Sequence, residues 1–179
     1  GVEISHRGLL NFLLAMQDEL QILPADKLLA LTTVAFDIAA LELYLPLING
    51  AEVVIASREH AKDPAKLANL ICKECITVMQ ATPSHWQALI VDHADQLGNI
   101  RALVGGEALP AQLAHKMRKL GHPIVNLYGP TETTIWSTIM RLDGDDLDSP
   151  PIGRPILNTQ VYVLDQAMQP VPLGAIGEL

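Results

Sequence analysis

Residues 100–130 read IRALVGGEALPAQLAHKMRKLGHPIVNLYGP, and their pattern sets the architecture of the chain. The apolar segment Ala102–Val104 predicts a strand that leads into a Gly-Gly turn. Pro110 then opens a predicted helix that ends at Gly121, and Ile124–Tyr128 predicts one more buried strand. Two strands joined through a helix in this order form the unit from which parallel sheets are built.

The same order of elements extends toward the N-terminus. Apolar residues at helical spacing predict helices over Leu9–Leu20, Ala39–Ile48 and 64–73, and β-branched or apolar runs predict strands at Leu28–Thr32, Glu52–Ala56 and Ile76–Met79. Asp63 with Pro64, and Thr82 with Pro83, are typical helix starts. Repeated β-then-α order predicts an α/β fold with a doubly wound, mostly parallel sheet, helices on both faces, and ligands at the carboxyl ends of the strands.

The character of the chain changes after residue 140. An acidic, proline-rich loop, DGDDLDSPPIGRP at 143–155, precedes a predicted strand at Gln160–Leu164. We therefore expect an α/β subdomain over 1–140, and an acidic loop with the start of a β-rich subdomain and a second sheet over 141–179. Asp143, Asp145 and Asp148 lie close together, but the EF-hand calcium pattern fails, because its sixth position is Asp148 instead of glycine and its twelfth is Arg154 instead of glutamate, which favours a solvated loop.

Composition excludes several classes of protein. The chain has 179 residues, 49% of them hydrophobic, and a formal net charge of −8 without a basic cluster, so it should bury a core and should not bind nucleic acid. The long apolar stretch from residue 28 to 48 contains Asp37, Glu42 and Pro46. Because an acidic residue at mid-span costs about 2.5–3.5 kcal/mol in a bilayer, we expect no membrane span. No secretory signal is visible, which predicts a cytoplasmic location.

The two cysteines, Cys72 and Cys75, form a C-x-x-C motif. The pair closes a predicted helix, where the helix dipole disfavours thiolates, and no second cysteine pair completes a zinc site. We expect two core or half-exposed thiols.

Two strand ends carry candidate site residues of uncertain role. Asp37 follows an apolar strand and precedes an apolar helix, so it is either an ordinary N-cap or a carboxylate in apolar walls that awaits a cationic group. Residues 104–109, VGGEAL, allow close approach of the backbone to a flat or bulky group. They do not form a G-x-G-x-x-G phosphate loop.

A third strand end is the most informative. Residues 126–134, NLYGPTETT, place an amide, an aromatic ring, several hydroxyls and one carboxylate around a Gly-Pro turn. Such a set could stack and hydrogen-bond a base, hold phosphate oxygens and bind Mg²⁺, although a plain turn with β-favouring threonines would look similar.

Taken together, three segments resemble the core motifs of adenylation domains of nonribosomal peptide synthetases, in the adenylate-forming acyl-CoA synthetase/luciferase superfamily. They are AFDIAALELYLPLINGA at 35–51, LVGGEALP at 103–110 and NLYGPTETTIWST at 126–138. The resemblance runs nearly end to end, and both ends of the chain resemble parts of further motifs. It therefore implies a central fragment of a larger enzyme.

The resemblance implies a function. Family members attack ATP with an amino acid to form an aminoacyl adenylate, then pass the acyl group to the phosphopantetheine thiol of a peptidyl carrier protein. ATP and Mg²⁺ are implied, with neighbouring synthetase domains as partners. Thr131 and Glu132 would be catalytic, Thr131 at the α-phosphate and Glu132 on Mg²⁺. The implied nucleotide-binding residues are Gly106, Glu107, Asn126, Leu127, Tyr128, Gly129 and Thr131.

The resemblance also implies an amino-acid pocket in which Asp37 pairs with the substrate ammonium. The other implied substrate-binding residues are Phe36, Ile38, Leu41, Gln80, Val104, Gly106, Leu127, Ile135 and Trp136. This set resembles the pattern associated with glycine, and Trp136, Leu41 and Ile135 would fill the space of a side chain.

Two other functions stay open. An acyl- or aryl-acid ligase of the same superfamily would share the nucleotide residues but usually not Asp37. A non-catalytic scaffold segment is disfavoured by the intact Thr131 and Glu132. Because the family's phosphate loop, ribose-binding aspartate and mobile-domain lysine are not in the sequence, we expect the 179 residues alone to be inactive.

Overall fold

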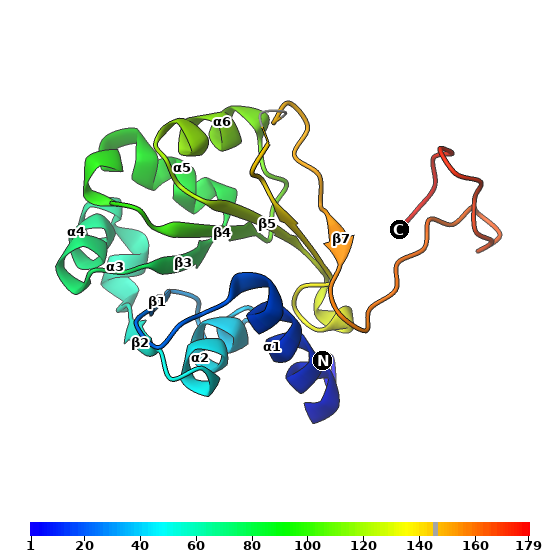
Figure 1. Ribbon diagram of the computed structural model, residues 1–179, viewed down its shortest axis with the longest axis horizontal. Helices are drawn as coiled ribbons and strands as arrows, with labels where there is room; N and C mark the ends of the chain where they lie inside the picture. Colours follow the sequence, from blue (N-terminus) through cyan, green and yellow to red (C-terminus); the bar gives the residue numbers. More distant parts are fainter. Residues whose placement is uncertain (145–146) are drawn as a thin grey trace.

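The computed structural model describes residues 1–144 and 147–179, and its centre is one seven-stranded sheet (Figure 1). The strand order is β2-β1-β3-β4-β5-β6-β7. The first five strands in this order are parallel, and β6 and β7 are antiparallel to their neighbours. The predicted doubly wound, mostly parallel α/β sheet is confirmed.

The elements follow one another as the alternating pattern predicts. The strands are β1 (Lys27–Ala30), β2 (Glu52–Ile55), β3 (Val78–Ala81), β4 (Arg101–Gly105), β5 (Ile124–Tyr128), β6 (Thr138–Arg141) and β7 (Arg154–Pro155). The helices are α1 (His6–Leu20), α2 (Ala39–Ile48), α3 (Arg58–Lys62), α4 (Pro64–Glu74), α5 (Pro83–Asp92) and α6 (Ala111–Lys119), with short 3₁₀ turns η1 (Ala94–Gln96) and η2 (Thr131–Thr133).

Side-chain caps fix the starts of several helices. Asp63 accepts hydrogen bonds from the backbone N–H groups of Ala65 and Lys66 at the start of α4, and Thr82 accepts one from the N–H of His85 in α5. Both caps precede a proline in the first turn, as predicted. A capping box at Ser57 also begins the short helix α3, which the sequence patterns did not indicate.

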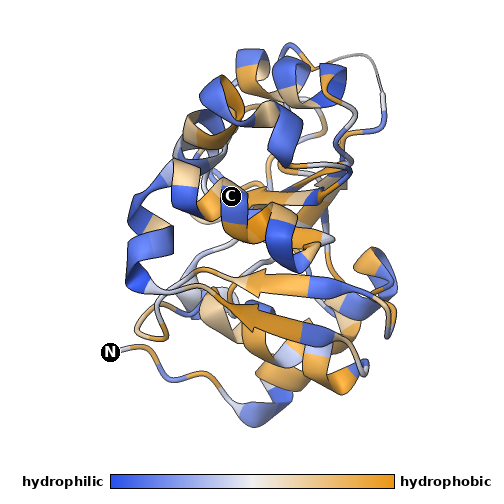
Figure 2. Ribbon diagram, turned by 90° about the vertical axis from the view of Figure 1, so that its left-hand side faces the viewer, coloured by the Kyte–Doolittle hydropathy of each residue, from blue (hydrophilic) through white to orange (hydrophobic). Residues whose placement is uncertain are grey.

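Each face of the sheet packs a separate apolar core. Successive strand residues point to opposite faces, so Leu28 joins the core beneath α1 and α2, whereas Leu29 joins the core beneath α4, α5 and α6. The two helical layers lie on opposite sides of the sheet in Figure 1. Figure 2 shows the strands coloured mainly hydrophobic, while hydrophilic colour is concentrated on the helices.

Two predicted strands begin or end differently for local reasons. The strand expected at Leu28–Thr32 ends at Ala30, because the N–H groups of Leu31 and Thr32 donate to the Glu42 carboxylate instead of continuing the ladder. The strand expected from Ile76 begins at Val78, because the N–H of Ile76 closes helix α4 by donating to the carbonyl of Ile71.

One strand prediction is wrong, and one strand begins late. The strand β6 begins only at Thr138, because Thr134 and Ile135 before it both have positive φ angles, 71° and 68°. No strand covers Gln160–Leu164 in the described part of the chain. Only Leu164 forms bridges, with Pro170 and Glu178, because this segment leaves the main sheet (Figure 1) and extended backbone needs a paired neighbour.

The remaining structural expectations concern single features. Cys72 and Cys75 are exposed, free thiols at the end of α4, so the expectation of core or half-exposed thiols is wrong: the buried face of α4 consists of Leu67, Ala68 and Ile71. None of the helices in residues 1–144 and 147–179 combines the length and the apolar character needed to cross a bilayer. Of the three aspartates compared with a calcium loop, Asp145 lies outside the described residues, and Asp148 pairs with the His115 ring at 3.1 Å.

The strand order predicts where ligands bind. In open parallel sheets, crevices form outside the carboxyl ends of strands, and the order 2-1-3-4-5 has its reversal point between β1 and β3. The loops after β1, β3, β4 and β5 therefore surround the expected sites.

Candidate functional site

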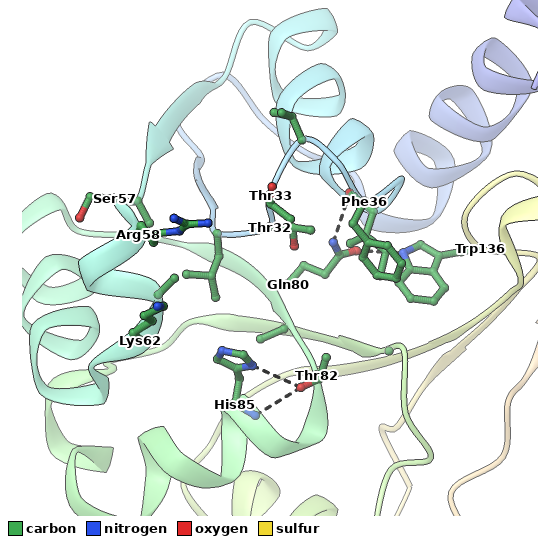
Figure 3. A pocket seen from close by; sticks show the side chains of 17 residues that line it. Thr32, Thr33, Phe36, Ser57, Arg58, Lys62, Gln80, Thr82, His85 and Trp136 are labelled. Carbon is green, nitrogen blue, oxygen red and sulfur yellow. Dashed lines mark hydrogen bonds between the residues drawn. The ribbon is translucent and has the colours of Figure 1, made fainter. Parts of the chain in front are cut away.

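A first pocket lies at the reversal point between β1 and β3. Its volume is about 590 Å³, and its walls come from the loop after β1, the end of β3 and the start of α5 (Figure 3). Phe36, Gln80 and Trp136 gather at one end of this first pocket, and Arg58 and Lys62 lie at the opposite end. The pocket is therefore apolar and enclosed at one end and cationic at the other.

Trp136 forms the floor of the enclosed end. Its side chain is 2% exposed, and its indole Nε1 donates a 2.8 Å hydrogen bond to Oε1 of Gln80. Gly105 makes room for the ring, because a Cβ at that position would lie 2.7 Å from Cη2 of Trp136. The Gly-Gly turn therefore makes room for a bulky group of the protein itself, the indole of Trp136.

Behind Gln80 lies a buried carboxylate whose role the sequence did not reveal. Glu42 is fully buried in α2 and accepts hydrogen bonds from the N–H groups of Leu31 and Thr32, the Thr32 hydroxyl and the Gln80 amide. Burial raises the pKa of Glu42, and the hydrogen bonds from Thr32, Gln80 and Leu31 oppose that rise. The sequence contains one sign of this role, an acidic residue inside an apolar helix, because a buried carboxylate needs such hydrogen-bond partners.

A second pocket lies at the carboxyl ends of β4 and β5. Its volume is about 600 Å³, and Trp136 belongs to the walls of both pockets. Six of the seven residues implied for nucleotide binding line it, namely Gly106, Glu107, Asn126, Leu127, Tyr128 and Gly129. The structure therefore brings this predicted set together, with Thr131 outside the lining.

Polar groups in the second pocket are held in place. Ser84 donates to Glu107 from its hydroxyl at 2.6 Å, and this hydrogen bond lowers the pKa of the Glu107 carboxyl. The amide of Asn126 donates a 2.8 Å hydrogen bond to the carbonyl of Pro151, which fixes its orientation at the pocket wall. The ring of Tyr128 is 43% exposed and is available for stacking.

The turn after β5 is shaped by close contacts and backbone strain. A Cβ at Gly129 would lie 2.5 Å from the backbone N of Ser137, so only glycine allows the chain to fold back here. Thr134 and Ile135 both have left-handed conformations, which typically cost about 1–3 kcal/mol each and cluster at functional sites. The turn exposes Glu132 on η2 while it buries Ile135 and Trp136.

Other residues implied for substrate binding lie around or behind the first pocket. Ile38 and Phe36 line it, whereas Leu41, Val104 and Ile135 are buried in the cores at 0–4% exposure. None of these three residues is among those that line the first pocket.

Asp37 is partly exposed beside the first pocket but is absent from its lining. Its backbone carbonyl accepts from Ala40, and the cap position of α2 is Ile38, without a side-chain cap. Within residues 1–144 and 147–179, no hydrogen bond is made by the Asp37 carboxylate, so the N-cap role considered for it is wrong. A carboxylate left without a protein partner suits a cationic ligand group.

Metal ligands are sparse in the described residues. No group of three or more His, Cys, Asp or Glu side chains there could hold an ion. Mg²⁺ commonly takes only one or two carboxylates and completes its shell with water and substrate phosphates. The exposed Glu132 carboxylate therefore fits Mg²⁺ that arrives with a nucleotide.

Comparison with known proteins decides the family. The AMP-binding enzyme family matches residues 1–179. The chain belongs to this family. It is 53% identical over 179 residues to a dimodular nonribosomal peptide synthase of Bacillus subtilis (strain 168), and 40% identical over 185 residues to tyrocidine synthase 3 of Brevibacillus parabrevis. These matches cover 100% of the chain but only 8% and 3% of the two relatives.

Solved structures agree with the fold. A four-domain nonribosomal peptide synthetase, holo-AB3403 bound to AMP and glycine, superposes with a TM-score of 0.91 at 43% identity, covering 99% of this chain and 13% of that one. CmiS6 superposes with a TM-score of 0.89 at 27% identity, covering 99% of this chain and 45% of that one.

Proposed function

We propose that this chain is the central part of an adenylation domain that activates an amino acid as its aminoacyl adenylate, and that glycine is the amino acid. The observation that carries the proposal is that two pockets of similar volume share one wall, the Trp136 indole. A condensation between an amino acid and ATP needs two binding sites that meet at the reacting atoms.

The second pocket is the proposed nucleotide site. Tyr128 offers an exposed ring on which adenine can stack, and the Asn126 amide is oriented at the wall. The backbone at Gly106 and Glu107 borders the same space. We assign the α-phosphate to the Thr131 hydroxyl, at the start of η2.

The first pocket is the proposed amino-acid site. The Asp37 carboxylate would pair with the substrate ammonium, which distinguishes amino-acid activation from activation of an acyl or aryl acid. The indole of Trp136 occupies the end of the pocket at which a substrate side chain would extend. The AMP- and glycine-bound relative at 43% identity supports this choice of substrate.

Catalysis in this proposal is mainly positioning and charge stabilisation. The two pockets would hold the substrate carboxylate against the α-phosphate, where oxygen attack forms the adenylate and releases pyrophosphate. Mg²⁺ bound at Glu132 would neutralise part of the negative charge that develops on the phosphates as pyrophosphate leaves. The second step, acyl transfer to the phosphopantetheine thiol of a peptidyl carrier protein, requires neighbouring synthetase domains. Use of ATP agrees with the cytoplasmic location expected from the sequence.

Amino-acid-dependent exchange of pyrophosphate into ATP by the full-length natural protein tests the proposal. We expect exchange with glycine, weaker exchange with alanine, and little with larger amino acids or with aryl acids. Exchange that requires an aryl or fatty acid would favour the acyl-acid ligase, and no exchange with any acid would favour the scaffold segment.

A further inference from the structure

A row of buried polar groups connects α2 to the floor of the first pocket. From Trp136, an N–H···O hydrogen bond of 2.8 Å reaches Gln80, and from Gln80 another of 3.0 Å reaches Glu42. Trp136, Gln80 and Glu42 are at most 2% exposed, and they come from the turn before β6, from β3 and from α2. Glu42 does not line either pocket, so it can influence the substrate only through its neighbours.

The carboxylate of Glu42 determines which way the Gln80 amide points. Every hydrogen-bond partner of Glu42 in the described residues is a donor: two backbone N–H groups on Oε2, and the Thr32 hydroxyl and the Gln80 amide N–H on Oε1. Gln80 must therefore turn its NH₂ group to Glu42, which leaves Oε1 to accept from the indole. The reverse orientation would set the amide oxygen against a carboxylate and two N–H groups against each other.

We propose that Glu42 is a positioning residue for the amino-acid pocket, one that orients the Gln80 amide and thereby holds the Trp136 indole as the pocket floor. This inference rests on the proposed function. Glu42 also holds the N–H groups of Leu31 and Thr32, so the same carboxylate fixes the loop that forms another wall of the pocket. A single buried group thus couples two walls.

An isosteric substitution tests the role sharply. In Glu42→Gln, one amide orientation sets the new NH₂ group against the two backbone N–H donors, and the other sets it against the Gln80 NH₂ group. A buried donor left without a hydrogen-bond acceptor typically changes an equilibrium constant by about tenfold or more. In the full-length natural protein we expect the KM for glycine to rise about tenfold, and the preference in kcat/KM for glycine over alanine to fall, because the indole is released. The KM for ATP should change less than the KM for glycine, because the proposed base contacts Asn126 and Tyr128 are not among the hydrogen-bond partners of Glu42, Gln80 or Trp136 in the described residues.

Exchange of the two groups should restore the network. In Glu42→Gln with Gln80→Glu, the amide at position 42 can accept from both backbone N–H groups and donate to the carboxylate at position 80, which still accepts from the indole. The double variant loses the weaker 3.4 Å contact of the Gln80 amide with the Ile38 carbonyl, and the Thr32 hydroxyl, which donates to Glu42 in the unmodified protein, must instead accept from the new NH₂ group. We expect the double variant to recover most of the glycine preference, whereas Gln80→Glu alone places two carboxylates together and loses it.

The outcomes separate the possibilities. A purely structural role would lower exchange with glycine and with alanine equally in Glu42→Gln, without recovery in the double variant, and that result would overturn the inference. If Glu42→Gln does not fold, Thr32→Val replaces it, since it removes one donor to the carboxylate, and an unchanged preference there would overturn the inference too. If the unmodified protein exchanges with no amino acid, the proposed function itself fails. If the unmodified protein catalyses exchange but the variants keep its preference for glycine over alanine, only the role of Glu42 is refuted.

Discussion

The indole Nε1 of Trp136 and the amide Oε1 of Gln80 are joined by a 2.8 Å hydrogen bond inside the protein. Gln80 lies within β3, and Trp136 lies two residues before β6, so the bond ties the third strand of the sheet to the turn that leads into the antiparallel strand β6. Because both side chains line the first pocket, the bond fixes the shape of the pocket floor.

Replacement of Trp136 by alanine should change the choice of substrate. Removing a floor of this size opens space for a side chain, and each methylene of pocket space is worth about 1–3 kcal/mol in discrimination. We therefore expect exchange with alanine or larger amino acids to gain on exchange with glycine. The indole is also buried, so the free energy of unfolding should fall by about 3–5 kcal/mol. A substrate panel and a melting curve measure the two effects.

Trp86 offers a matched control for this experiment. It is also fully buried, and its indole donates a 3.2 Å hydrogen bond to the carbonyl of Leu103, but it lines neither pocket. Trp86→Phe and Trp136→Phe each shorten an indole and remove its hydrogen bond. A change of preference in both variants, or in neither, would contradict the assignment of Trp136 as the floor.

Glu132→Gln should slow adenylation far more than it weakens binding of the amino acid. The carboxylate is exposed on η2, away from the first pocket, and its proposed role is to hold Mg²⁺ as charge develops. We expect a loss of about 100-fold or more in the exchange rate. The KM for glycine should change little, and Glu3→Gln, at another exposed glutamate, should leave both quantities unchanged. Parallel losses in rate and in amino-acid affinity would disprove the metal role.

The strands and helices that the sequence predicts best are those with complete local signals. Ile124–Tyr128 is a mainly apolar run in which only Asn126 is strongly polar, and the observed β5 has the same bounds. Asp63 and Thr82 each combine a capping side chain with a following proline, and both caps are observed. Here local sequence and tertiary structure favour the same conformation.

The features that were missed depend on contacts distant in sequence. Ile135 has a β-favouring side chain, yet its φ is 68°, because the turn at Gly129 brings the chain back against itself. The role of Glu42 could not be predicted from its spacing, since its partners Thr32 and Gln80 meet it only after the sheet has formed. Both features shape the pocket floor, where folding places residues against their local preferences.

Acidification should destabilise the protein through His122. This ring is 2% exposed, neither nitrogen has a hydrogen-bond partner of normal geometry among the described residues, and burial lowers its pKa, an effect that the backbone at Ile100 only partly offsets. Below about pH 6.5 the unfolded chain therefore binds a proton that the folded chain does not. The free energy of unfolding should fall as the pH decreases from 6.5 toward the lowered pKa.

Denaturation at pH 7.5 and pH 5.5 measures this contribution. His122→Leu keeps the site apolar and removes the titrating group, so its stability should depend less on pH than that of the unmodified protein. His6→Gln, at an exposed position, should retain the full dependence. An equal fall in all three proteins would exclude His122 as its source.

Gly105→Ala should displace the indole without replacing any side chain that hydrogen-bonds to it. The added Cβ would lie 2.7 Å from Cη2 of Trp136 and 2.9 Å from the carbonyl of Leu127, and the backbone contact cannot be relieved by a rotamer change. Overpacking of this kind typically costs about 1–3 kcal/mol. The indole of Trp136 must then move out of its place in the first pocket or strain its hydrogen bond to Gln80. We therefore expect both a lower melting temperature and a reduced preference for glycine. Gly144→Ala, where a Cβ meets no atom of the described residues within 4 Å, is the control for backbone entropy. A Gly105→Ala protein with its melting temperature lowered but its glycine preference intact would mean that the indole can shift without reshaping the pocket, and the floor would then have to be assigned to other side chains.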